Sequence, residues 1–121
     1  MSRQTLPHGS DEPEVYYYDV PYLPKLALNV KLDVLSTVNQ ANEVEQHVLL
    51  TEPETVLVKL LLDKRHCPYD DAMQAVQRDR GTVSEMVKGL NTKLEPLGLV
   101  ILMLSIIEYL LIDSRRNQRM I

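Results

Sequence analysis

The feature that most constrains this 121-residue chain is an apolar run of sixteen residues, Leu97–Ile112, which carries a single charge at Glu108. Three structures suit such a run: a membrane anchor, a buried helix, or two strands folded into a hairpin. A membrane helix needs about 20 apolar residues, and a helix that is apolar all round needs a larger core than this chain can build. Ser105 and Glu108 bracket a short tip between two strand-length segments, so we expect a β-hairpin.

Upstream of this run, the hydrophobic side chains first alternate with polar ones. The alternation from Leu26 to Val34 predicts a strand with one buried face. The segment Asn39–Asn42 has the composition of a turn, and Glu43–Leu50 is typical of a second, shorter strand. These two strands would form an antiparallel pair at the amino-terminal side of the domain.

Between the strands and the hairpin the hydrophobic spacing changes to that of helices. Thr51 and Glu54 have the spacing of a capping box that begins a first helix, Pro68 opens a second, and Thr82 with Glu85 is expected to cap a third. The expected inner faces are Val56, Leu57, Leu60 and Leu61, then Tyr69, Ala72, Met73 and Val76, then Val83, Met86, Val87, Leu90 and Leu94. The predicted fold class is α+β.

Charge and proline content divide the chain into three parts. Residues 1–24 form an expected flexible acidic tail that contains Tyr and Pro, residues 25–113 one domain, and residues 114–121 a basic tail. Three tyrosines in a row, Tyr16, Tyr17 and Tyr18, are unusual in a solvated tail. We expect them to dock on the domain or on a partner.

The sequence contains few motifs typical of catalytic, metal-binding or phosphate-binding sites. The single cysteine, Cys67, favours a reducing compartment, and the polar first residues show no signal-peptide core, so we expect a cytoplasmic protein without a membrane partner. One His–Cys pair at His66 and Cys67 is no zinc signature. No phosphate-binding glycine loop and no catalytic triad pattern is visible. We therefore predict no enzyme activity, no cofactor, no metal and no small-molecule substrate.

Three segments carry a resemblance to a known family. The segments are LLTEPETVLVKLLL, TVSEMVKGLNTKL and EYLL. Their order and spacing resemble the OmpR/PhoB-type winged helix-turn-helix domain of transcriptional regulators, here without a receiver domain. The matching positions are Leu50, Thr51, Glu54, Leu57, Leu60 and Leu61, then Thr82, Val83, Val87, Leu90, Lys93 and Leu94, then Tyr109 and Leu111.

This resemblance implies a small DNA-binding transcriptional regulator. Its third helix would enter the major groove of duplex DNA, and the hairpin would act as the wing. The groove-facing side chains would be Thr82, Ser84, Glu85, Lys88 and Asn91, while Lys93, Arg115 and Arg116 would contact phosphates. Members of the family are usually dimers on direct repeats, so a homodimer is also implied.

The departures from the family pattern favour a second hypothesis. The third helix has Gly89 and Asn91 where arginines are common, and the tip of the hairpin has Ile106 and Ile107 instead of basic residues and glycines. An apolar tip suits a protein partner better than phosphates. The alternative is therefore a winged-helix interaction module, an adaptor or modulator of a regulator protein, with Tyr16–Tyr18, Ile106 and Ile107 as its contact surface.

Overall fold

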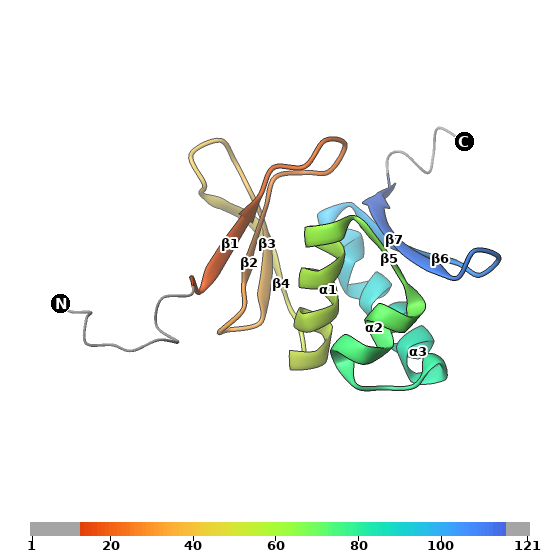
Figure 1. The fold of residues 1–121 in the computed structure, drawn as a ribbon. Helices are drawn as coiled ribbons and strands as arrows, with labels where there is room; N and C mark the ends of the chain where they lie inside the picture. The colour runs from red at the N-terminus through yellow and green to blue at the C-terminus, as the bar shows by residue number, and fades with distance from the viewer. Residues whose placement is uncertain (1–12, 116–121) are drawn as a thin grey trace.

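Residues 13–115 are described by a computed structural model, in which three helices lie between two antiparallel sheets (Figure 1). The fold is α+β. One hydrophobic core joins the layers, and it includes Leu26, Leu28, Leu57, Leu90 and Ile101. Within residues 13–115, none of the helices combines the length and the apolar character that crossing a bilayer requires.

The first sheet is an antiparallel meander on one side of the helices. Its strands follow the order β1 (Val15–Tyr18), β2 (Leu26–Asn29), β3 (Val34–Val38) and β4 (Val44–Leu49). Leu26, Leu28 and Leu35 are fully buried, so this face of the sheet covers the helices. The predicted second strand corresponds to β4.

The predicted strand from Leu26 to Val34 is wrong, because a turn divides it into β2 and β3. The side-chain oxygen of Asn29 accepts the backbone N–H groups of Lys31 at 3.0 Å and Leu32 at 2.8 Å. Asp33 has a φ of 59°, which asparagine and aspartate tolerate better than most residues. Alternation alone does not reveal such a turn, since the apolar positions keep the same period across it.

The structure also differs from the predicted boundary of the amino-terminal tail. Val15–Tyr18 forms β1, the first strand of the sheet, and Tyr16 pairs with Leu28 of β2. The proline-rich composition of residues 1–24 concealed a four-residue strand. Residues 1–12 of the predicted acidic tail and residues 116–121 of the basic tail lie outside the described residues.

The three helices are α1 (Glu52–Lys64), α2 (Tyr69–Val76) and α3 (Arg80–Leu94). The capping box of α1 is confirmed: Thr51 accepts the N–H of Glu54 at 3.3 Å, and Glu54 accepts the N–H of Thr51 at 2.9 Å. The buried apolar face of α1 is rotated from the prediction. It consists of Leu57, Val58, Leu61 and Leu62, whereas Val56 is exposed.

The start of α3 differs from its prediction. Asp79, not Thr82, is the N-cap, and its carboxylate accepts the N–H of Thr82 at 2.7 Å. Thr82 therefore lies within the first turn, and the predicted capping box with Glu85 does not form. Val83, Val87, Leu90 and Leu94 are buried as expected.

The predicted carboxy-terminal hairpin is confirmed. Strands β6 (Leu99–Leu104) and β7 (Tyr109–Ser114) pair in register, and Ser105–Glu108 forms the tip. A third strand, β5 (His66–Pro68), pairs with β7 and was not expected from the sequence. Leu99, Ile101, Leu110 and Ile112 are buried, so one face of this sheet closes the core behind α1 and α3.

Arg65 joins the two sheets at the end of α1. Its backbone carbonyl accepts the N–H of Ile112 at 3.1 Å, and its guanidinium donates to the carbonyl of Pro21 at 3.2 Å. The same guanidinium lies 3.9 Å from the carboxylate of Asp113. Arg65 has a φ of 68°, a conformation that side chains seldom adopt and that this set of contacts maintains.

Candidate interaction surfaces

The solvent side of α3 carries little net charge. Thr82, Glu85 and Lys88 are exposed there, and Ser84 is half-buried. Lys88 lies 3.4 Å from the carboxylate of Glu85, one helical turn earlier. The positive charge of Lys88 and the negative charge of Glu85 therefore largely cancel for a DNA phosphate that approaches this side of α3.

Asn91, expected to face a DNA groove, bonds to the hairpin instead. Its amide nitrogen donates to the carbonyl of Ile101 at 2.9 Å, and its side-chain oxygen accepts the N–H of Ile101 at 2.7 Å. Both backbone groups lie on the free edge of β6. At Ile101 the side chain of Asn91 thus takes the place of a neighbouring strand.

Lys93 and Arg115, expected to contact phosphates, are also bonded within the protein. The Lys93 ammonium lies 2.6 Å from the buried carboxylate of Glu54, which is only 7% exposed. The Arg115 guanidinium donates to the carbonyl of Asn91 at 2.8 Å. Arg116 lies outside the described residues.

Ion pairing extends over most of the positive charge in residues 13–115. Seven of the ten lysines and arginines there have a carboxylate oxygen within 4.0 Å. These seven are Lys31, Lys59, Lys64, Arg65, Arg80, Lys88 and Lys93. Phosphate binding would have to replace these contacts, which lowers its net gain.

The tip of the hairpin is apolar and firmly attached. Ile106 is 98% exposed and Ile107 is 60% exposed. Below them, the carbonyl of Glu108 accepts the N–H of Tyr69 at 2.9 Å, and the carboxylate of Glu108 lies 3.2 Å from Arg80. The tip is therefore tied to the first residues of α2 and α3, and it presents two aliphatic side chains to solvent.

The tyrosine segment is divided between the two faces of β1. The Tyr16 ring lies under the Lys59 ammonium at 4.2 Å, and the Tyr18 hydroxyl donates to Asp63 at 2.7 Å. Burial, followed by the hydrogen bond to Asp63, raises the pKa of Tyr18 well above its ordinary value. Tyr17 points to the opposite face and is 54% exposed. Two of the three rings therefore dock on α1, and one is left for solvent or a partner.

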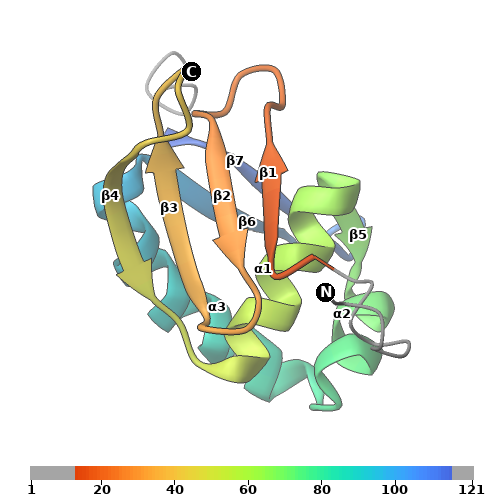
Figure 2. The same ribbon diagram turned by 90° about the vertical axis from the view of Figure 1, so that its left-hand side faces the viewer.

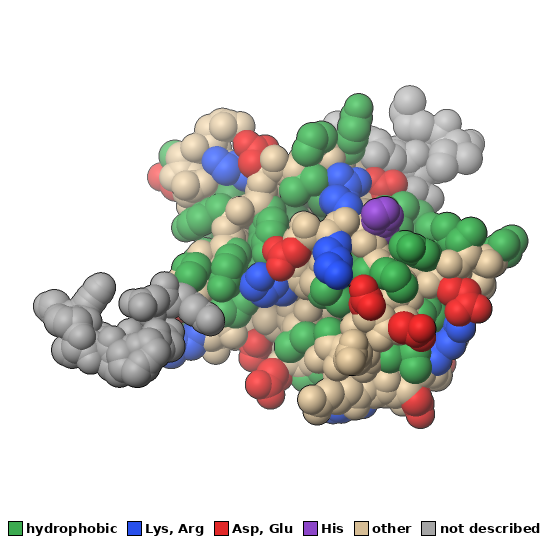
Figure 3. All heavy atoms as spheres, in the orientation of Figure 1, with side chains coloured by type: hydrophobic (Ala, Val, Ile, Leu, Met, Phe, Trp, Pro, Cys, Tyr) green, Lys and Arg blue, Asp and Glu red, His purple; other side chains and the backbone are tan. Residues whose placement is uncertain are grey.

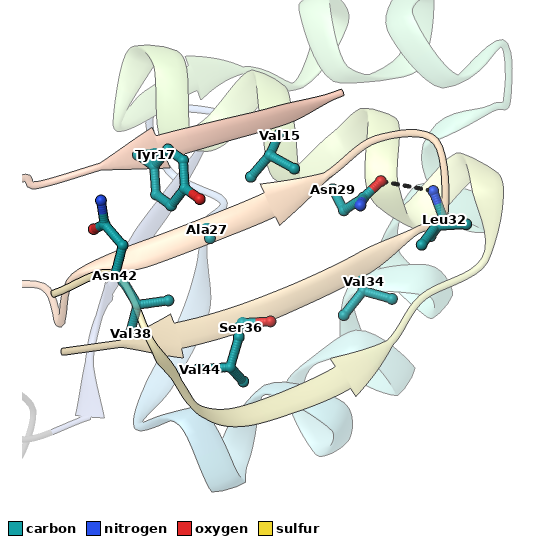
Figure 4. Close-up of a pocket in the computed structure, with 10 residues that line it drawn as sticks. All are labelled: Val15, Tyr17, Ala27, Asn29, Leu32, Val34, Ser36, Val38, Asn42 and Val44. Carbon is teal, nitrogen blue, oxygen red and sulfur yellow. Dashed lines mark hydrogen bonds between the residues drawn. The ribbon is translucent and has the colours of Figure 1, made fainter. Parts of the chain in front are cut away.

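The solvent face of the first sheet contains a shallow apolar hollow of about 260 Å³ that sequence reasoning missed (Figure 4). Its lining residues are Val15, Tyr17, Ala27, Asn29, Leu32, Val34, Ser36, Val38, Asn42 and Val44. Hydrophobic side chains are visible over this sheet and at the hairpin tip in the space-filling view (Figure 3). The sequence contains one signal for this hollow: β1 and β3 have apolar residues at successive positions, and successive residues of a strand point to opposite faces.

The potential metal ligands and the cysteine within residues 13–115 bear on metal binding and nucleophilic chemistry. No three His, Cys, Asp or Glu side chains among them gather in a way that could hold a metal ion. Cys67 is buried in the core, and this burial raises the pKa of its thiol. A thiol of this kind is a poor nucleophile, because little of it is ionised near neutral pH.

Comparison with known proteins gives no relative. No protein-family model, no curated protein and no solved structure matches this chain.

Proposed function

We propose that this protein is an interaction module of winged-helix type, an adaptor or modulator of a transcription regulator, which uses the hairpin tip to bind a protein partner. The observation that carries the proposal is the exposure of Ile106 and Ile107 on a tip that Glu108 ties to α2 and α3. An apolar projection held by such contacts loses less conformational entropy than a free loop when a partner covers it. In this proposal α2 and α3 correspond to the helix-turn-helix, and β6 and β7 to the wing.

We further propose a cytoplasmic location. The single cysteine, Cys67, is free and buried, which is the state expected in a reducing compartment.

The experiment is affinity capture with the immobilised full chain. Replacing Ile106 and Ile107 together by Asp should remove a specific partner captured from an extract of the source cells, because two carboxylates would have to be desolvated in an apolar contact. Leu32→Asp is the matched control, since Leu32 is 66% exposed in the turn between β2 and β3, which belongs to the other sheet. Equal capture by the wild type and the double variant would contradict the proposal.

The second candidate function is the DNA-binding regulator of the OmpR/PhoB type. It is supported by the order of the elements and by the exposure of Thr82, Glu85 and Lys88 along one side of α3. Replacing Lys88 would change the charge of this side of α3 without removing a contact that holds the fold, because its partner Glu85 is itself exposed.

A gel shift with nonspecific duplex at about 50 mM salt separates the two functions, because even weak phosphate contacts register there. The interaction module should show no shift. A shift that Lys88→Glu weakens, while the equivalent change at the remote Lys31 does not, would instead support the DNA-binding function.

A further inference from the structure

The edges of the two sheets differ in how they are protected. An edge strand exposes unpaired N–H and C=O groups, and proteins usually shield it by shortness, charge, proline or a covering element. Four strands form such edges in residues 13–115: β1 and β4 in the first sheet, β5 and β6 in the second.

Three of these edges are shielded. Asn91 occupies both backbone groups of Ile101 on β6. Strand β5 has three residues and ends at Pro68. Strand β1 has four residues, and its Tyr16 and Tyr18 side chains attach it to α1, which lies beside it in Figure 2.

Strand β4 lacks such a shield along its second half. It has six residues, contains neither Lys nor Pro, and forms the left border of the sheet in Figure 2. Val44 is 59% exposed and Leu49 is 66% exposed. A bulge between Thr37 and Val38 of β3 disturbs only the beginning of β4, so the segment Gln46–Leu49 remains regular.

The register identifies the backbone groups that point outward. The N–H of Leu50 donates to the carbonyl of Asp33 at 2.8 Å, and Val48 pairs with Leu35. Alternate residues of an antiparallel strand direct their backbone groups to opposite sides. The N–H and C=O groups of His47 and Leu49 therefore point away from β3, toward the free edge.

We propose that a second copy of this chain pairs antiparallel with β4 through the backbone of His47 and Leu49, which joins two four-stranded sheets into one of eight strands. The segment Gln46–Leu49 carries no acidic or lysine/arginine side chain, so a two-fold arrangement brings no like charges together at the axis. Such a contact is isologous and closes at the dimer. It is independent of the hairpin tip and of the partner proposed for it.

The contact is small, and this sets its expected strength. Pairing along one short edge buries less than the roughly 800 Å² per partner of a standard stable interface. The dimer is therefore expected to form reversibly and to depend on protein concentration.

The proposal is tested by sedimentation equilibrium of the full chain over a hundredfold range of concentration. This range corresponds to about 2.7 kcal/mol in binding free energy. The average mass of the wild type should rise toward that of two chains. His47→Pro should weaken self-association by about tenfold or more, because it removes an outward N–H and places a ring on the edge. His47→Ala keeps the N–H and should behave as the wild type. The ladder to β3 does not use the His47 N–H, so proline suits this edge position.

Amide hydrogen exchange of the wild type provides a second measurement that needs no variant. Exchange at His47 and Leu49 should slow as the concentration rises, whereas Val48, whose N–H faces β3, should not change. A wild type that stays monomeric over the whole range overturns the proposal. Unaltered association of His47→Pro would also overturn it, and so would amide exchange at His47 and Leu49 that does not change with concentration. Loss of the dimer in Ile107→Asp would overturn it as well, because it would place the contact at the hairpin tip.

Discussion

The single residue Asn91 protects an edge of the second sheet. A carboxamide carries a donor and an acceptor side by side, as the backbone of a paired strand does, and here both bond to Ile101. Because these backbone groups are part-buried, the bonds matter more than exposed ones would. Arg115 in turn bonds the Asn91 carbonyl, so the end of the described chain fastens the same position.

Asn91→Ala should lower the free energy of unfolding by about 2 kcal/mol, because it leaves two part-buried backbone groups without a partner. The measurement is urea unfolding, with the midpoint falling at an unchanged slope. Thr92→Ala, at the neighbouring exposed position of α3, should change stability by a few tenths of a kcal/mol. Equal effects of the two substitutions would contradict the role given to Asn91.

Asp79 gives the start of α3 a pH dependence. Hydrogen bonds from Thr82, that of its backbone first, lower the pKa of Asp79 below its ordinary value of 3.8. A lowered folded pKa means that the stabilisation is present at neutral pH and is lost as the pH falls from the ordinary value through the folded one.

Asp79→Asn keeps the capping oxygen but does not titrate. Between about pH 5 and pH 3, its thermal midpoint should therefore fall less than that of the wild type. The comparison is made by circular dichroism at a series of pH values. Parallel curves for the two proteins would show that Asp79 contributes nothing to the acid sensitivity.

The sequence could not reveal these individual roles. Asn91 and Lys93 were assigned to DNA because a resembling family uses those positions, and periodicity says which helical face is polar but not what that face meets. Ile101 and Glu54, their actual partners, are 10 and 39 residues away in the sequence. Only the packing of the chain brings them together.

At the scale of elements, hydrophobic periodicity predicted the three helices and the hairpin, while the turn at Asn29 and the short strands β1 and β5 escaped it. The capping box at Thr51 and the unbroken apolar run after Leu97 are local signals, and both structures formed as expected. The Asn29 turn and the short strand β5 have no comparable signal. Strand β5 exists because β7 provides a partner for three residues.

The pair between Lys93 and Glu54 connects α3 to the first turn of α1. Lys93→Met should lower the free energy of unfolding by about 1–2 kcal/mol, because it leaves the buried carboxylate of Glu54 without its cation. Lys88→Met is the matched control, since the Glu85 partner of Lys88 is exposed. Thermal or urea unfolding measures both. A larger effect at Lys88 than at Lys93 would contradict this difference in role.

At the scale of the whole molecule, β1 belongs to the folded unit. A chain that begins at residue 25, the boundary expected from the sequence, would lack the partner strand of β2 and the attachment of Tyr18 to Asp63. It should unfold with a free energy lower by about 3 kcal/mol than a chain that begins at residue 13. Equilibrium unfolding compares the two. Equal stability would mean that β1 adds nothing to the domain.

Arg65 contacts segments of both sheets at once. One guanidinium contacts Pro21, in the connection that leads into β2, and Asp113 on β7, while the backbone of the same residue bonds Ile112. The β1–β2 connection and the hairpin therefore share Arg65 as a common contact. Two segments that are far apart in the sequence thus depend on one residue for their relative position.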